Sequence, residues 1–235
     1  MRFTLATVAT ALIGAVAVLA APAPKYTGCS LSSIQIPKEV LVDPTNSSNI
    51  LAAPAANEKL FKIVLGYGSQ NYSCVNGVAT PNGAVATLYD LSCAFAVSPE
   101  WADVLTRGAV QMDPTAQLAG IQMLKNMFNA QFIAGVHYFK GDFATPLFEF
   151  TDKAKFIGGV GGKIPALLGS DTGKRPDNYG AVPSLKLVPK QGMGSTVSTI
   201  YRLHTAGGSP PPGTCNWQGQ KQIPYAAQYW VYKST

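Results

Sequence analysis

Charged side chains are scarce in this sequence, and so are the residues that usually bind metals. Charged residues make up 13% of the 235-residue chain, about half the usual share. The 18 basic residues are scattered and do not form the run that a nucleic-acid groove needs. With two histidines and no Cys-x-x-Cys pair, a common zinc site is not expected either. The sequence therefore predicts no nucleic-acid partner and no metal.

The loops that bind nucleotide cofactors are also missing. The glycine-rich stretch at 157–162 lacks Gly-x-Gly-x-x-Gly, because Ile164 occupies the place of the third glycine. Lys163 is not followed by the Ser or Thr of a phosphate-binding loop. No Gly-x-Ser-x-Gly elbow of a serine hydrolase is present. We therefore predict no cofactor and no NAD-dependent dehydrogenase, and we interpret 157–162 as a flexible hinge.

Long uncharged apolar runs are absent after the first 20 residues. Arg2 precedes an apolar run from Leu5 to Leu19, which is shorter than the ~20 residues of a spanning helix. Small residues at Val18 and Ala20 complete the pattern of a secretory signal. We predict a signal peptide at 1–20, a secreted extracellular protein, and no membrane span.

Glycine and proline are plentiful, which is typical of a turn-rich β protein. The chain has 23 Gly and 17 Pro. We predict an extended leader and loop at 21–57, followed by a single β domain at 58–235 with a strong turn at Pro81–Gly83. Ser98-Pro99 can start a helix, which places a helical insertion at 98–128. The predicted fold class is all-β: a single antiparallel β-sandwich or barrel with a small helical insertion.

Four cysteines in a chain with a predicted secretion signal indicate two disulfides. They are Cys29, Cys74, Cys93 and Cys215, and their spacing leaves three pairings open. Asn46 and Asn71 each begin an Asn-x-Ser sequon, so we predict a glycoprotein. Asn71 lies close to Cys74 and is expected to be the less accessible of the two.

Two histidines are the main candidates for chemistry. His137 is expected within a strand and His204 just before a glycine-rich loop. If both pointed into one cleft with a carboxylate such as Asp142, they could form an acid–base group. The alternative is that each histidine is structural. Paired carboxylates near Asp142 could also serve a glycosidase, but that needs a separation of about 5–10 Å that a sequence cannot establish.

Aromatic residues crowd the C-terminal part of the chain. Trp217, Tyr225 and Trp230 are candidates for ligand binding, because exposed flat rings stack on sugars. The alternative is that these rings fill the core. Trp217 is the strongest candidate, since it follows Cys215 in a polar stretch.

Several segments in order resemble one known family: Gly66–Cys74, Gly83–Asp90, Gly135–Phe139, Pro146–Phe148, Ile200–Gly208 and Pro224–Trp230. Together they are similar to the secreted, mostly fungal family called domain of unknown function 3455. The resemblance implies a secreted fungal single domain with the pairs Cys74–Cys215 and Cys29–Cys93. It implies no established activity and no catalytic residue. Members are sometimes labelled malate dehydrogenase, which this sequence does not support.

These observations favour a secreted, non-catalytic protein that associates with cell-wall or host polysaccharide, expected as a monomer. Trp217, Tyr225 and Trp230 would then contact the sugar. The first alternative is a secreted hydrolase or lyase that acts on polysaccharide through His137, His204 and Asp142. The second alternative is a structural surface protein without a ligand.

Overall fold

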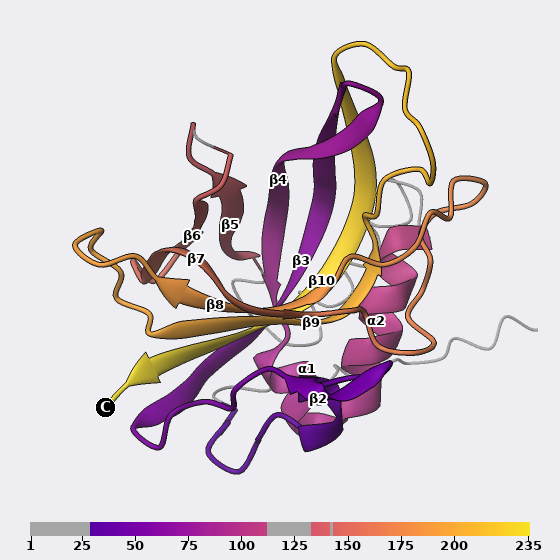
Figure 1. Cartoon of the computed structure of the whole chain (residues 1–235). Helices are drawn as coiled ribbons and strands as arrows, with labels where there is room; N and C mark the ends of the chain where they lie inside the picture. Colours follow the sequence, from indigo (N-terminus) through magenta and orange to yellow (C-terminus); the bar gives the residue numbers. More distant parts are fainter. Residues whose placement is uncertain (1–28, 112–132, 142) are drawn as a thin grey trace, which may run out of the picture.

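The chain forms a closed antiparallel barrel in a computed structural model that describes residues 29–111, 133–141 and 143–235 (Figure 1). Eight strands follow one another around the barrel in the order β10-β3-β4-β5-β6-β7-β8-β9. Their bounds are β3 Glu58–Val75, β4 Val78–Asp90, β5 Ile133–Phe139, β6 Pro146–Phe150, β7 Lys155–Ile164, β8 Ser184–Pro189, β9 Thr199–Gly207 and β10 Gln220–Ser234. A separate two-stranded sheet pairs β1 (Val42–Asp43) with β2 (Asn46–Ile50). The predicted antiparallel all-β fold is confirmed.

The described helices lie outside the barrel and cover one part of its wall. A short 3-10 helix spans Lys38–Leu41, α1 spans Ser92–Val97 and α2 spans Pro99–Gln111. Helix α2 packs against β9 and β10 (Figure 1). The predicted insertion at 98–128 therefore begins earlier, at Ser92, and its part beyond Gln111 lies outside the described residues.

Strand β10 separates two hydrophobic clusters, because its alternate side chains point to opposite faces. Tyr225 and Tyr229 point into the barrel, where they pack with Phe148 and Phe156. Trp230 points to the outside, and Phe95 of α1 meets its ring edge-on at 4.8 Å between centroids. The barrel interior is thus filled by aromatic rings, and the helices are held by a second core on its outer surface.

The first hairpin turns at Asn76, not at the predicted turn Pro81–Gly83. Asn76 and Gly77 have φ values of 51° and 78°, and a two-residue Asn-Gly loop of this kind matches the twist of a hairpin. Pro81 lies inside β4, opposite Tyr72. Since β4 pairs with β5 only through residues 86–89, the missing N–H of Pro81 breaks no bond of that ladder.

The glycine-rich stretch at 157–162 is part of strand β7, so its interpretation as a hinge was wrong. Gly158 is required there by close approach of the neighbouring strand. A Cβ at this position would lie 2.2 Å from the Val188 carbonyl oxygen of β8. Gly158 therefore allows β7 and β8 to pack closely, where the sequence pattern alone indicated a break.

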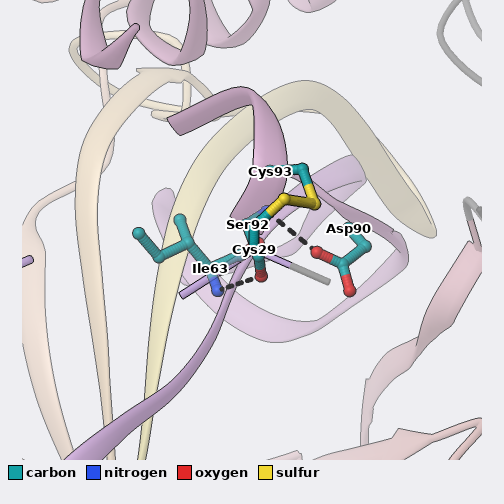
Figure 2. Close-up of a disulfide and its surroundings, with 5 residues drawn as sticks. All are labelled: Cys29, Ile63, Asp90, Ser92 and Cys93. Atoms are coloured by element: carbon teal, nitrogen blue, oxygen red, sulfur yellow. Dashed lines mark hydrogen bonds between the residues drawn. A yellow bond between two sulfur atoms is a disulfide. The ribbon is translucent and has the colours of Figure 1, made fainter. Parts of the chain in front are cut away.

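Two disulfides join segments that are distant in the sequence, with the pairing that the resemblance implies. Cys74–Cys215 ties the end of β3 to the loop before β10, and Cys29–Cys93 ties the first described residue to α1. Beside Cys93, the Ser92 N–H donates to Asp90 Oδ1 at 2.8 Å and the Ile63 N–H donates to Ser92 Oγ at 3.1 Å (Figure 2). Hydrogen bonds thereby attach the start of helix α1 to β3 and β4, and the disulfide attaches the helix to the segment before β1.

Gly68 and Gly159 provide a matched test of close packing between strands. A Cβ on Gly68 would lie 1.9 Å from the Val85 carbonyl oxygen, whereas a Cβ on Gly159 would meet only Lys190 Cε at 3.9 Å. We expect Gly68→Ala to lower the free energy of unfolding by about 1–3 kcal/mol. Gly159→Ala should be neutral or stabilising, by up to about 1 kcal/mol. Urea denaturation measures both, and equal losses would contradict the close approach of β3 and β4.

Candidate functional site

A β-bulge in β9 turns His204 out of the barrel. Leu203 pairs with Gln228 and Ala206 pairs with Ala226, so two residues of β9 lie opposite the single residue Ala227. His204 is one of these two and has a left-handed φ of 46°. A bulge of this kind re-aims side chains and is frequent next to functional sites. Here it points His204 towards helix α2, away from the interior that Ile200 faces.

His204 meets a carboxylate on that helix. Its Nδ1 lies 3.0 Å from Oδ1 of Asp103. Asp103 is placed there because α2 buries Ala102, Thr106 and Ala109 against the barrel wall, and Asp103 stands beside this buried face. The side chain of His204 is 22% exposed and that of Asp103 is 39% exposed. The pair is therefore shielded without being sealed from water.

Asp103 is itself fixed by strand β10. Gln228 Nε2 donates to Oδ1 of Asp103 at 2.8 Å, and Trp230 Nε1 donates to Oε1 of Gln228 at 3.2 Å. Burial raises the pKa of Asp103, but the bonds from His204 and Gln228 and the charge of Arg107 outweigh it, so the pKa lies below its usual value. Asp103 is thus an ionised carboxylate that orients the imidazole ring.

The His204–Asp103 pair lines a pocket of about 240 Å³ between α2 and the segment after β7. The other lining residues are Thr106, Arg107, Leu167, Leu168, Gly169, Ser170 and Thr205. The pocket thus combines an imidazole–carboxylate pair, a guanidinium group and an apolar wall. Convergent polar groups in a concave site make this pocket the candidate site.

His137 takes no part in this site. It lies inside the barrel with its ring stacked on Phe148 at 4.0 Å, and its Nδ1 donates to the Leu147 carbonyl at 3.0 Å. Burial lowers its pKa to about 4, with the charge of Arg202 acting in the same direction and the bond to Leu147 opposing it. The two histidines therefore do not share a cleft, and His137 is a neutral core residue.

The carboxylate beside His204 is not Asp142, the residue expected from the sequence. Asp142 lies outside the described residues. Of its neighbours in the sequence, Glu149 lies 3.2 Å from Lys155 Nζ, and Asp152 lies 2.7 Å from Lys62 Nζ. These two carboxylates therefore form ion pairs away from the pocket, which takes its carboxylate from α2 instead.

Of the three aromatic candidates, only Trp217 reaches the surface. Tyr225 and Trp230 are buried, so they offer no ring face to a ligand. Trp217 is half-buried, and Lys221 Nζ lies 5.3 Å from its ring centroid and 5.3 Å from that of Tyr179. Trp217, Tyr179 and Lys221 form a surface group that we call the tryptophan patch.

Within residues 29–111, 133–141 and 143–235, no group of three or more His, Cys, Asp or Glu side chains is arranged to hold a metal ion. None of the helices in these ranges has the length and apolar character needed to cross a membrane.

Two of the segments that resemble the family contribute residues to this site: the Ile200–Gly208 motif contains His204 and the Pro224–Trp230 motif contains Gln228. Residues 54–233 match the family described as a protein of unknown function (DUF3455). The chain belongs to this family. The matched region includes α2, the His204–Asp103 pocket and the whole barrel except Ser234, the last residue of β10. Neither the curated proteins nor the solved structures provide a match.

Asp103 is the carboxylate of this candidate site that the sequence did not reveal. It is 101 positions from His204, and no local pattern links the two. One feature of the sequence could have located Asp103: the helical spacing of apolar residues after Pro99 places it next to a buried helix face. The bulge that turns His204 towards it becomes evident only once β9 is paired with β10.

His137 makes stability depend on pH. Its pKa falls from 6.5 to about 4 on folding, so the unfolded chain binds more protons between these values. Stability is then complete above pH 6.5 and falls by about 3 kcal/mol as the pH drops towards 4. We expect His137→Phe, which keeps a ring against Phe148, to weaken this dependence. Urea midpoints across this range measure it, and an unchanged slope would contradict the assignment.

The two sequons have opposite environments. Asn46 lies on β2, which is exposed along its length, whereas Asn71 is 6% exposed within β3. The folded barrel has no room for a glycan at Asn71. We expect mass spectrometry of protein secreted from a eukaryotic host to find a glycan on Asn46 alone. Asn46→Gln should then abolish the mobility change caused by endoglycosidase, and Asn71→Gln should leave it intact.

Proposed function

We propose that this protein is a secreted hydrolase or lyase that acts on polysaccharide, with His204 as its general base. The observation that carries this proposal is the hydrogen-bonded pair of His204 and Asp103 in a pocket. The two disulfides fit an extracellular protein. Of the three residues expected for a hydrolase, this proposal keeps His204, leaves out His137 and replaces Asp142 with Asp103.

The roles follow from the chemistry of the imidazole ring. When Nδ1 donates its proton to Asp103, the neutral ring has a free lone pair on Nε2. That nitrogen can take a proton from water or from a substrate group. The carboxylate of Asp103 holds the tautomer and stabilises the imidazolium that forms. His204 is the catalytic residue, and Asp103 is a positioning residue.

A second candidate function is non-catalytic binding of cell-wall polysaccharide at the tryptophan patch. Trp217 and Tyr179 each present part of a ring near the surface, and Lys221 lies between them. Disulfide Cys74–Cys215 fixes the loop that carries Trp217. Aromatic rings held in this way can stack on sugars. The two functions are compatible, since the patch and the pocket share no residue.

One experiment tests both functions. The mature protein is incubated with insoluble chitin, β-glucan, cellulose and pectin, and both retention and release of soluble products are measured. We expect His204→Gln to lower product release by about 10²-fold or more and to leave retention unchanged. Asp103→Asn should lower kcat with little change in KM. Trp217→Ala should reduce retention.

The outcomes separate the proposals, with circular dichroism used to confirm that each variant is folded. Product release that persists in His204→Gln would overturn the general base. Retention without any product release, lost in Trp217→Ala, would favour the binding protein. His137→Phe serves as the matched control, because it removes the other imidazole without touching the pocket.

A further inference from the structure

We infer that the pocket accepts a short acyl ester, so that the reaction at His204 is the removal of a small acyl group from a sugar hydroxyl. This inference rests on the proposed function and names its substrate class. Three observations support it: the size of the pocket, its apolar wall, and the number of carboxylates that line it.

The pocket is small and one side of it is apolar. Its volume of about 240 Å³ lies below the roughly 300–1,000 Å³ of pockets that enclose drug-sized ligands. Such a space is too small to enclose a segment of polymer, but it can hold a pendant group of a few atoms. Leu167 and Leu168 line the pocket with the polar pair. An acyl group fits this combination, since its alkyl part is apolar and its carbonyl is polar.

The carboxylate count favours an ester over a glycosidic bond. Among the described residues that line the pocket, Asp103 is the only carboxylate, and its Oδ1 already accepts from His204 and Gln228. Glycosidases of the common type use two carboxyl groups, one of which protonates the leaving oxygen. An ester can be hydrolysed with a single imidazole, because the ring first removes a proton from water and then returns it.

The step balances without any further reagent. Nε2 of His204 takes a proton from water while the water oxygen attacks the ester carbonyl carbon. The tetrahedral oxyanion that forms collapses, the bond from carbon to the sugar oxygen breaks, and the imidazolium gives its proton to that oxygen. The products are a carboxylic acid and a free sugar hydroxyl, and the acid then loses its proton to solvent.

Arg107 supplies the positive charge that this step requires. It lines the pocket and lies one helical turn after Asp103 on α2. A guanidinium group near a developing oxyanion lowers the barrier, because charge stabilisation is stronger in a partly enclosed site. We therefore expect Arg107→Gln to lower kcat for ester hydrolysis, with a smaller effect on KM.

The test uses p-nitrophenyl acetate, butyrate and octanoate together with an acetylated xylan, whose free acetate is measured. We expect hydrolysis to decrease from acetate to octanoate, and His204→Gln to lower kcat/KM for acetate by about 10²-fold or more. The rate that remains in His204→Gln also measures the background hydrolysis caused by the other imidazole of the chain, and it is subtracted. His137→Phe, which changes a side chain outside the pocket, is expected to retain activity. Loss of ester hydrolysis in a folded Ser170→Ala protein would overturn direct attack by water.

Two leucine variants test the shape of the pocket. Leu167→Ala should enlarge it and raise the activity on octanoate relative to acetate by about 10-fold. Leu168 is 80% exposed, so Leu168→Glu should leave the fold intact while raising KM for the esters. An unchanged preference in a folded Leu167→Ala protein together with an unchanged KM in Leu168→Glu would overturn the acyl pocket.

The remaining outcomes distinguish this inference from the proposed function. Sugar release or elimination that depends on His204, without any ester hydrolysis, would overturn the assignment of an ester substrate. It would still support His204 as the general base. Ester hydrolysis that is unchanged in His204→Gln would overturn both. Hydrolysis of acetate and acetylated xylan that is lost in His204→Gln would support both.

Discussion

Strand β10 is buried on both faces, and the fold and the site depend on this arrangement. Its inward residues join the aromatic interior, and its outward residues form the surface on which α1 and α2 pack. Gln228 is fully buried among these outward residues, where an unpaired amide would be costly. The amide is satisfied by Asp103 and Trp230. The interaction that stabilises the helix on the barrel therefore also orients the carboxylate of the site.

One extra residue in β9 decides which histidine meets that carboxylate. In a regular strand, alternate residues share a face, and His204 would point inward with Ile200 and Arg202. The bulge opposite Ala227 breaks this alternation and gives His204 a left-handed backbone conformation. Such a conformation costs of order 1–3 kcal/mol for a residue other than glycine. The pairing of β9 with β10 on both sides of the bulge holds it, and the imidazole reaches Asp103 as a result.

The sequence predicted the antiparallel β fold because turn residues and apolar alternation are local signals. The predictions from sequence were wrong where the role of a residue depends on contacts with residues far away in the chain. Pro81 and Gly83 are typical of a turn, yet they lie within β4, because its partner β3 continues past them. Gly158 is needed for the approach of β8 rather than for a bend. For the site, His204 was found as a residue type, whereas Asp103 was not, because a register shift and a helix-packing angle bring the two together.

The contrast between the two histidines shows why a site must be judged by its surroundings. His137 has partners that favour a structural role: a stacked ring, a carbonyl acceptor and only 3% of its surface exposed. These partners hold its pKa at about 4, so it is a weak base near neutral pH. His204 has a carboxylate partner, partial exposure and a pocket beside it. Aromatic rings pack inside the barrel wall, and the proposed site lies where a helix and a bulged strand meet on its outer surface.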